Sequence, residues 1–240
     1  MFTFELLLLC IPSPGVPYTY LPEHETVVNS WSYNTNIVTD IKQLPYHVLI
    51  VYGSKYCSGT LTGSRTVVTA ATCFVRNKGE PIVVKAGSNS MVGSGQIISV
   101  LEYKVHEYFQ NLSNLDNDIA LLILKEHVLF DGNVIKAQLV ESEVALREST
   151  PIKVSGWGGP HLPEGRLSDN GGGATFKNIL VGILSWGANS KDQYNVAILT
   201  NVSYFERWIK LNTIRFLTKY CVVKENSKLL GIHSDEYVES

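Results

Sequence analysis

Three consecutive glycines, Gly171 to Gly173, place the strongest constraint on how this chain can fold. Glycine lacks a Cβ and reaches backbone angles closed to other residues, so the run predicts a tight loop without room for side chains. A mostly apolar run from Ile179 to Trp186 follows, and it is long enough for one buried strand. Loops that enter core strands often carry function, but these residues alone favour a simple glycine-rich turn.

The surroundings of this loop point to a family. Four segments occur in the order found in chymotrypsin-like (trypsin-type) serine peptidases: Thr69-Ala70-Ala71-Thr72-Cys73, Asn117-Asp118-Ile119-Ala120-Leu121-Leu122, Gly156-Trp157-Gly158, and Asp169-Asn170-Gly171-Gly172 with the later Gly182-Ile183-Leu184-Ser185-Trp186-Gly187. They resemble the family motifs Thr/Ser-Ala-Ala-His-Cys, Asn-Asp-Ile-Ala-Leu-Leu, Gly-Trp-Gly, and Gly-Asp-Ser-Gly-Gly-Pro with Gly-Ile-Val-Ser-Trp-Gly. The resemblance covers roughly 37–211 and implies an all-β, trypsin-like double β-barrel with a C-terminal helix.

The same resemblance assigns the three triad positions to Thr72, Asp118 and Asn170. A serine peptidase needs a hydroxyl nucleophile, an imidazole that takes its proton and a carboxylate that orients the imidazole. Asp118 fits the carboxylate position. A threonine hydroxyl does not titrate near neutral pH, and an asparagine amide nitrogen is not a useful nucleophile. We therefore expect no intact catalytic centre.

No other residue offers an obvious replacement. Ser168 lies two positions before Asn170 but has no assigned base. The six histidines have no motif around them and are typical of surface or capping residues, so a relocated catalytic dyad is not favoured. They are His24, His47, His106, His127, His161 and His233.

Other parts of the family's site are altered or kept. Ser168 replaces a glycine that helps to aim the oxyanion-loop amides, whereas Asp169, the family's partner for a new amino terminus, is retained. Glu164 aligns with the base of the specificity pocket, where an acid suits Lys or Arg ligands. Ser185-Trp186-Gly187 matches the segment that pairs with an extended peptide, although a core strand with a buried Trp is the simpler alternative.

Composition limits the remaining function classes. The 240 residues carry a net charge of −2, which suggests neither nucleic acid nor an anionic membrane as a partner. There are 4 cysteines, of which Cys57 and Cys73 correspond to the family's first-barrel disulfide. A free pair is the alternative, and a zinc site is disfavoured because no second Cys/His pair lies nearby. We expect no cofactor and no metal, and a protein or peptide partner.

The amino-terminal part has features of secretion. Residues 1–15 resemble a signal peptide, although the positive region is missing and Glu5 interrupts the apolar run. Residues 16–36 lack periodicity and predict a pro-segment or linker. Ile37-Val38 resembles the family's mature amino terminus, but Asn36 precedes it where zymogens carry a basic residue. If the chain is secreted and extracellular, the sequons at Asn111 and Asn201 are glycosylation candidates, with unused sequons as the alternative.

The strand pattern predicts one complete barrel and one truncated barrel. Six β-prone runs between 46 and 124 can close on each other: 46–52, 57–61, 65–70, 81–87, 96–105 and 119–124. The second barrel, about 134–202, is short because only eleven residues, Gly159 to Asp169, separate Gly158 from Asn170. Family members have several tens of residues there, which contribute about two strands and a helix. The second barrel is therefore incomplete, or other segments replace its strands.

Two segments follow that barrel. Residues 204–211 match the family's helix, the last part of a domain spanning 37–212. Residues 213–240 extend beyond it, and 215–223 could supply a helix turn or a substitute strand. The prediction is a catalytically inactive serine peptidase homologue, of the kind found in insects, that acts by binding as a cofactor, decoy or regulator in an extracellular protease cascade. The alternatives are an active trypsin-like endopeptidase with a misassembled sequence, or an unstable product.

Overall fold

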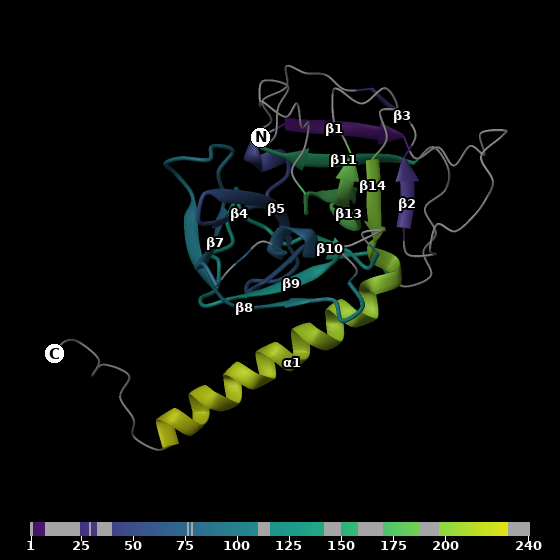
Figure 1. Ribbon diagram of the computed structural model, residues 1–240. Helices are drawn as coiled ribbons and strands as arrows, with labels where there is room; N and C mark the ends of the chain where they lie inside the picture. Colours follow the sequence, from purple (N-terminus) through teal and green to yellow (C-terminus); the bar gives the residue numbers. More distant parts are fainter. Residues whose placement is uncertain are drawn as a thin grey trace.

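The computed structural model describes residues 2–7, 25–28, 30–32, 40–75, 77, 79–109, 116–141, 150–157, 170–187 and 197–229. Within these residues the chain forms a closed barrel, a second sheet and one long helix (Figure 1). Two short 3-10 helices, η1 (Ile41–Gln43) and η2 (Ala71–Phe74), lie at the ends of barrel strands. This mostly β architecture confirms the predicted fold class.

The first barrel contains the six predicted strands. They are β4 (His47–Tyr52), β5 (Lys55–Leu61), β6 (Thr66–Thr69), β7 (Ile82–Ala86), β8 (Gln96–Val105) and β9 (Ala120–Leu124). They close in the order β4-β5-β6-β9-β8-β7, so none of the six has a free edge. All five residues of β9 are buried, which explains why its sequence is uniformly apolar. In β8 buried or half-buried positions alternate with more exposed ones, because the outer face of this strand meets solvent.

The second sheet differs from the expected truncated barrel. The strands from the predicted region are β10 (Gln138–Leu139), β11 (Pro151–Gly156), β12 (Gly173–Phe176), β13 (Ile179–Gly187) and β14 (Ala197–Asn201). Three amino-terminal strands join them: β1 (Phe2–Leu7), β2 (Glu25–Val28) and β3 (Ser30–Ser32). The sheet order is β2-β14-β13-β12-β11-β1-β3, and β10 pairs with β13.

The amino-terminal strands lie in two segments for which the sequence predicts other roles. Within residues 16–36, predicted to be a pro-segment or linker, β2 and β3 pair with β14 and β1. Residues 1–15, expected to be a signal peptide, contain β1, which pairs with β11 over six residue pairs. Period-2 patterning is weak in both segments, and the partners of β1 and β2 in β11 and β14 lie more than a hundred residues away in the sequence.

The carboxy-terminal helix is also longer than predicted. It runs as α1 (Val202–Leu229) rather than over 204–211, and it includes the segment 215–223, which is therefore helix and not a substitute strand. The helix passes below β8 in Figure 1. Lys219 Nζ donates to Glu102 Oε2 at 2.6 Å, and the Tyr220 hydroxyl donates to the same carboxylate. Phe216 is buried in the main core. The first part of the predicted extension 213–240 is therefore continuous with the domain.

One hydrophobic core spans both halves of the molecule. Polar contacts join them as well. The Tyr46 hydroxyl lies 2.8 Å from Thr175 Oγ1, and His47 Nδ1 lies 2.9 Å from Ser155 Oγ. The Trp157 indole packs on the His47 ring at 4.5 Å between centroids. Burial lowers the pKa of His47 to about 3, so this histidine is a neutral interior residue rather than the surface or capping group expected.

Candidate functional site

Asp118 is the buried centre of the candidate functional site. Asn117 before it takes a left-handed conformation with φ of 56°, which asparagine tolerates better than most residues. The Asp118 side chain lies inside the protein, where the residue is 1% exposed. From the second sheet, Thr200 Oγ1 of β14 donates to the Asp118 backbone carbonyl at 2.9 Å. Contacts with both halves of the molecule therefore hold this residue in place.

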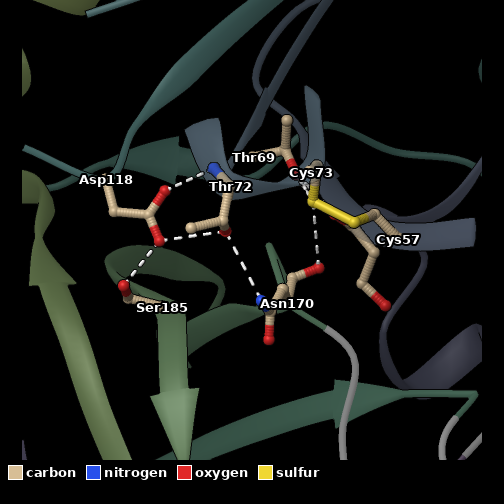
Figure 2. Close-up of a disulfide and its surroundings, with 8 residues drawn as sticks. Cys57, Thr69, Thr72, Cys73, Asp118, Asn170 and Ser185 are labelled. Carbon is tan, nitrogen blue, oxygen red and sulfur yellow. Dashed lines mark hydrogen bonds between the residues drawn. A yellow bond between two sulfur atoms is a disulfide. The ribbon is translucent and has the colours of Figure 1, made fainter. Parts of the chain in front are cut away.

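Thr72 lies on one side of the Asp118 carboxylate (Figure 2). It belongs to η2, which follows β6, and its backbone N–H donates to Asp118 Oδ1 at 2.8 Å. Its hydroxyl donates to Asp118 Oδ2 at 3.1 Å. The neighbouring Cys73 forms the predicted disulfide with Cys57 of β5, which ties η2 to the barrel. Thr72 thus supplies two donors to Asp118.

Asn170 is the third triad position, and together with Thr72 and Asp118 it forms a hydrogen-bonded row. Its Nδ2 donates to Thr72 Oγ1 at 3.4 Å, and its carbonyl accepts from the Ser58 N–H at 3.0 Å. The same carbonyl lies 3.6 Å from Cys73 Sγ, a van der Waals contact because a disulfide sulfur carries no hydrogen. The structure therefore brings Thr72, Asp118 and Asn170 together, as the resemblance predicts.

The glycine-rich loop requires its first glycine because it approaches the first barrel closely. Gly171 has φ of +84°, and a Cβ at this position would collide with Thr69 Oγ1 and with the Ser58 carbonyl oxygen. The Gly171 N–H donates to the Leu184 carbonyl at 2.8 Å, and the Leu184 N–H donates to the Gly172 carbonyl at 2.8 Å. The loop is thus fixed between β13 and the first barrel, which positions Asn170.

Ser185 makes a contact that sequence reasoning missed. Its hydroxyl donates to Asp118 Oδ2 at 2.5 Å, and Ser185 is buried. The sequence motif places Ser185 only in a peptide-binding segment with Trp186 and Gly187. Trp186, the next residue of β13, is 49% exposed, so the alternative of a buried core Trp is wrong. A β-bulge lies between Leu184 and Trp186, at the point where the chain passes from the buried Ser185 to the exposed Trp186.

Burial sets the electrostatics of the site. Desolvation raises the pKa of the Asp118 carboxyl from 3.8 to about 6, although the hydrogen bonds from Ser185 and Thr72 favour the charged form. The hydrogen bonds run in one direction, from the Asn170 amide to the Thr72 hydroxyl and on to Asp118. None of these donors takes a proton near neutral pH, so the row can hold the carboxylate but does not form a Ser–His relay.

Two Ser–His pairs occur elsewhere in the described parts of the chain. His47 pairs with Ser155 in the interior, and His127 Nδ1 lies 2.8 Å from Ser64 Oγ on the surface. Neither pair includes a carboxylate among the contacts of the described residues. His106 lies in an aromatic cluster with Phe205 and Trp208, at centroid distances of 5.1 and 5.0 Å. These contacts do not favour a relocated catalytic dyad.

Several predicted positions lie outside the described residues. They are Glu164, Ser168, Asp169, Asn111, the Asn36–Ile37 bond and the histidines 24, 161 and 233. Asn201 is described: its Oδ1 accepts from the Ser203 N–H at 3.0 Å and caps the start of α1. Among the described residues there is no group of three metal-ligating side chains, and no helix has the length and apolarity to cross a bilayer.

Comparison with known proteins agrees with this fold and with these motifs. Residues 36–169 match the family model described as Trypsin. The chain therefore belongs to the trypsin family. It is 26% identical over 227 residues to the vitellin-degrading protease of Bombyx mori, a match covering 75% of this chain and 85% of that relative. It is 24% identical over 216 residues to trypsin 5G1 of Aedes aegypti, covering 71% and 80% respectively.

A solved structure is similar over most of the fold. The scabies mite inactivated protease paralogue S-D1 superposes with a TM-score of 0.64 at 19% sequence identity. The match covers 72% of this chain and 93% of the mite protein. At this identity the likeness shows the shared fold and nothing further.

Proposed function

We propose that this protein is a serine peptidase homologue that binds a protein or peptide partner without cleaving it. The observation that carries the proposal is the hydrogen-bonded row from Asn170 through Thr72 to Asp118. The family's nucleophile and base are replaced by an amide and a hydroxyl, and both act as donors in the row that ends at the buried carboxylate. Without an imidazole, no donor of this row can take a proton from an attacking hydroxyl or water.

The remaining machinery supports at most weak catalysis. Oxyanion stabilisation and binding alone leave a rate about 10³–10⁴ above that of water when a triad is disabled. The mite protein that shares the fold is described as an inactivated protease paralogue, so this scaffold is compatible with loss of activity. Its description is support by analogy, because fold alone does not decide function.

The peptide-binding segment supplies the proposed contact surface. β13 ends at Ser185-Trp186-Gly187, and the exposed indole of Trp186 offers a large apolar contact. An extended peptide could add to this segment through backbone hydrogen bonds. The Cys57–Cys73 disulfide fits an oxidising compartment, so we propose an extracellular role as cofactor, decoy or regulator among proteases.

The first experiment tests for catalysis. The purified full-length protein is incubated with a fluorophosphonate probe and with a broad library of peptide and ester substrates. We expect neither stoichiometric labelling nor turnover, and an active trypsin serves as the positive control. Stoichiometric labelling would show that a working nucleophile exists and would favour the active endopeptidase instead.

A second experiment tests peptide binding at Trp186. A panel of immobilised extended peptides is screened against the wild type, Trp186→Ala and Tyr204→Ala. Tyr204 is a matched control because it is also an exposed aromatic residue, at 56%, but lies on α1. Trp186→Ala should weaken binding by about tenfold or more, while Tyr204→Ala should not. Equal affinities for all three proteins would exclude this surface.

A further inference from the structure

The second sheet without its amino-terminal strands would have two free edges. In the order β14-β13-β12-β11, the outer strands are β11 and β14. The interval between β11 and β12 is short, because only twelve residues, Gly158 to Asp169, lie between Trp157 and Asn170. Two further strands with their turns need more chain than that. Unpaired edges expose rows of N–H and C=O groups and invite pairing with other chains.

Strands from the amino-terminal part pair with both of these edges. β1 is antiparallel to β11 from Phe2↔Gly156 to Leu7↔Pro151, and β2 is antiparallel to β14 from Val28↔Ala197 to Glu25↔Thr200. β3 then pairs with the outer side of β1. The two ends of the sheet, β2 and β3, are separated by one residue in the sequence, so they must lie close together (Figure 1).

We propose that β1, β2 and β3 are a permanent structural part of the second sheet and complete the edges that the short interval after Trp157 has too few residues to cover. Their sequences suit this role, since Phe4, Val27 and Trp31 are among the β-prone residue types. Glu5, Leu6 and Leu7 pair with β11 on one side and with β3 on the other, so β1 is an interior strand.

The family resemblance implies that the amino-terminal segment is cut off, whereas this proposal requires that it stays in the mature protein. Cutting before Ile37 and releasing the upstream segment would here uncover the edges of β11 and β14 and destabilise the fold. Likewise, residues 1–15 cannot be both a removed leader and a strand of the mature sheet. The role of these strands is independent of the loss of catalysis, so either could fail without the other.

The test begins with hydrogen exchange on the full-length protein. We expect slow exchange for the amides of β1, β2 and β11. Sequencing of the mature protein, expressed in insect cells, should find that residues 2–7 are still part of the chain. Exchange of β1 amides at the rate of an unprotected peptide, or a mature terminus beyond residue 7, would overturn the proposal.

Matched variants test the coupling of β1 to β11. Leu6 has β11 on one side and β3 on the other, so its backbone N–H faces one of these two strands. Leu6→Pro removes this N–H, whereas Leu6→Val keeps it. Leu6→Pro should speed exchange in β11 on the order of a hundredfold, and exchange in β4 to β9 should not change. Leu6→Val should resemble the wild type. Unchanged β11 exchange in Leu6→Pro would also overturn the proposal; if that variant fails to fold, the wild-type measurements decide.

Discussion

At the scale of single residues, Asp118 is a buried carboxylate held by hydroxyl and amide donors. Thr72 occupies one side of it with two hydrogen bonds, and Ser185 adds a third. The buried charge is costly, because the described contacts give it neutral donors and no cation. Its pKa of about 6 places the titration of this carboxyl within a range that can be measured in the folded protein.

The raised pKa predicts a pH dependence of stability. The folded carboxyl binds its proton more tightly than the unfolded one, so its contribution is fully present below about pH 4 and is lost as the pH rises through about 6. Asp118→Asn removes this contribution. The difference in free energy of unfolding between the wild type and the variant should change by up to about 3 kcal/mol between about pH 4 and pH 8.

Denaturant titrations of both proteins across this pH range measure the effect. His47, whose pKa is lowered, acts in the opposite direction, but it is present in both proteins and cancels in the comparison. Parallel pH profiles for the two proteins would contradict a buried Asp118 with a raised pKa.

Restoring the family's side chains should not restore the enzyme. Thr72→His together with Asn170→Ser recreates the triad residues, but Asn36 offers a trypsin-like activator no cleavage site. We expect turnover no greater than the residual level of about 10³–10⁴ over water, measured with the same peptide and ester substrates. Turnover like that of ordinary trypsins would mean that the altered second sheet and the uncut chain are no obstacle.

At the scale of elements, the glycine loop and the long helix each contact the first barrel. The loop reaches the first barrel only because no side chain stands between them. The helix begins at the end of β14, and Lys219 and Tyr220 on its later turns contact Glu102 of β8. Each element can be tested with a substitution and a matched control.

Gly171→Ala tests the close approach of the loop. Gly93 is the control, because its φ of +85° is nearly the same but no atom lies within 4 Å of the position that a Cβ would take. Gly93→Ala should cost about 1 kcal/mol for the left-handed backbone alone. Gly171→Ala should cost about 2 kcal/mol more, since the new methyl group meets Thr69 and Ser58. If chemical denaturation gave the same loss of unfolding free energy for both variants, the loop would have moved to accommodate the new methyl group.

Phe216→Ala tests the contribution of the extended helix. Phe216 is 7% exposed, while Ile214 on the same helix is 61% exposed. We expect Phe216→Ala to lower the free energy of unfolding by about 3 kcal/mol. Ile214→Ala should change it by less than about 0.5 kcal/mol, because a surface substitution loses little burial. Similar small effects for both variants would mean that the helix beyond Asn212 is not part of the cooperative unit.

At the scale of the whole molecule, the two halves are built differently. The first barrel is closed, local in sequence and crosslinked by the Cys57–Cys73 disulfide, whose loop contributes about 3 kcal/mol in the chain-entropy model. The second sheet assembles strands from distant parts of the chain and has no disulfide among its described residues. The shared core nevertheless joins the halves.

This difference predicts unequal protection against hydrogen exchange. The amides of β4 to β9 should be the slowest to exchange, and those of β12 to β14 should exchange at least about tenfold faster through partial opening. Peptide-resolved exchange of the native protein measures both sets at once. Equal exchange rates in the two halves would mean that the second sheet, with its amino-terminal strands, is as stable against local opening as the closed first barrel.

The sequence by itself determined the family and the first barrel, and it predicted the residues of the candidate site. Six alternating or apolar runs, each close to its partners along the chain, predicted the barrel strands to within about two residues. The motifs around Thr72, Asp118 and Asn170 predicted that these residues meet, because each motif is short and resembles a family segment with a fixed place in the fold.

Only the tertiary structure decided how the second sheet is completed and how far the helix extends. The amino-terminal strands carry a weak local pattern, and pairing with β11 and β14 across the length of the sequence defines them. The bond from Ser185 to Asp118 and the burial of His47 likewise depend on which elements face each other. Such contacts depend on how segments far apart in the sequence pack together. A pattern of residues within one short segment does not show which distant segment will face it.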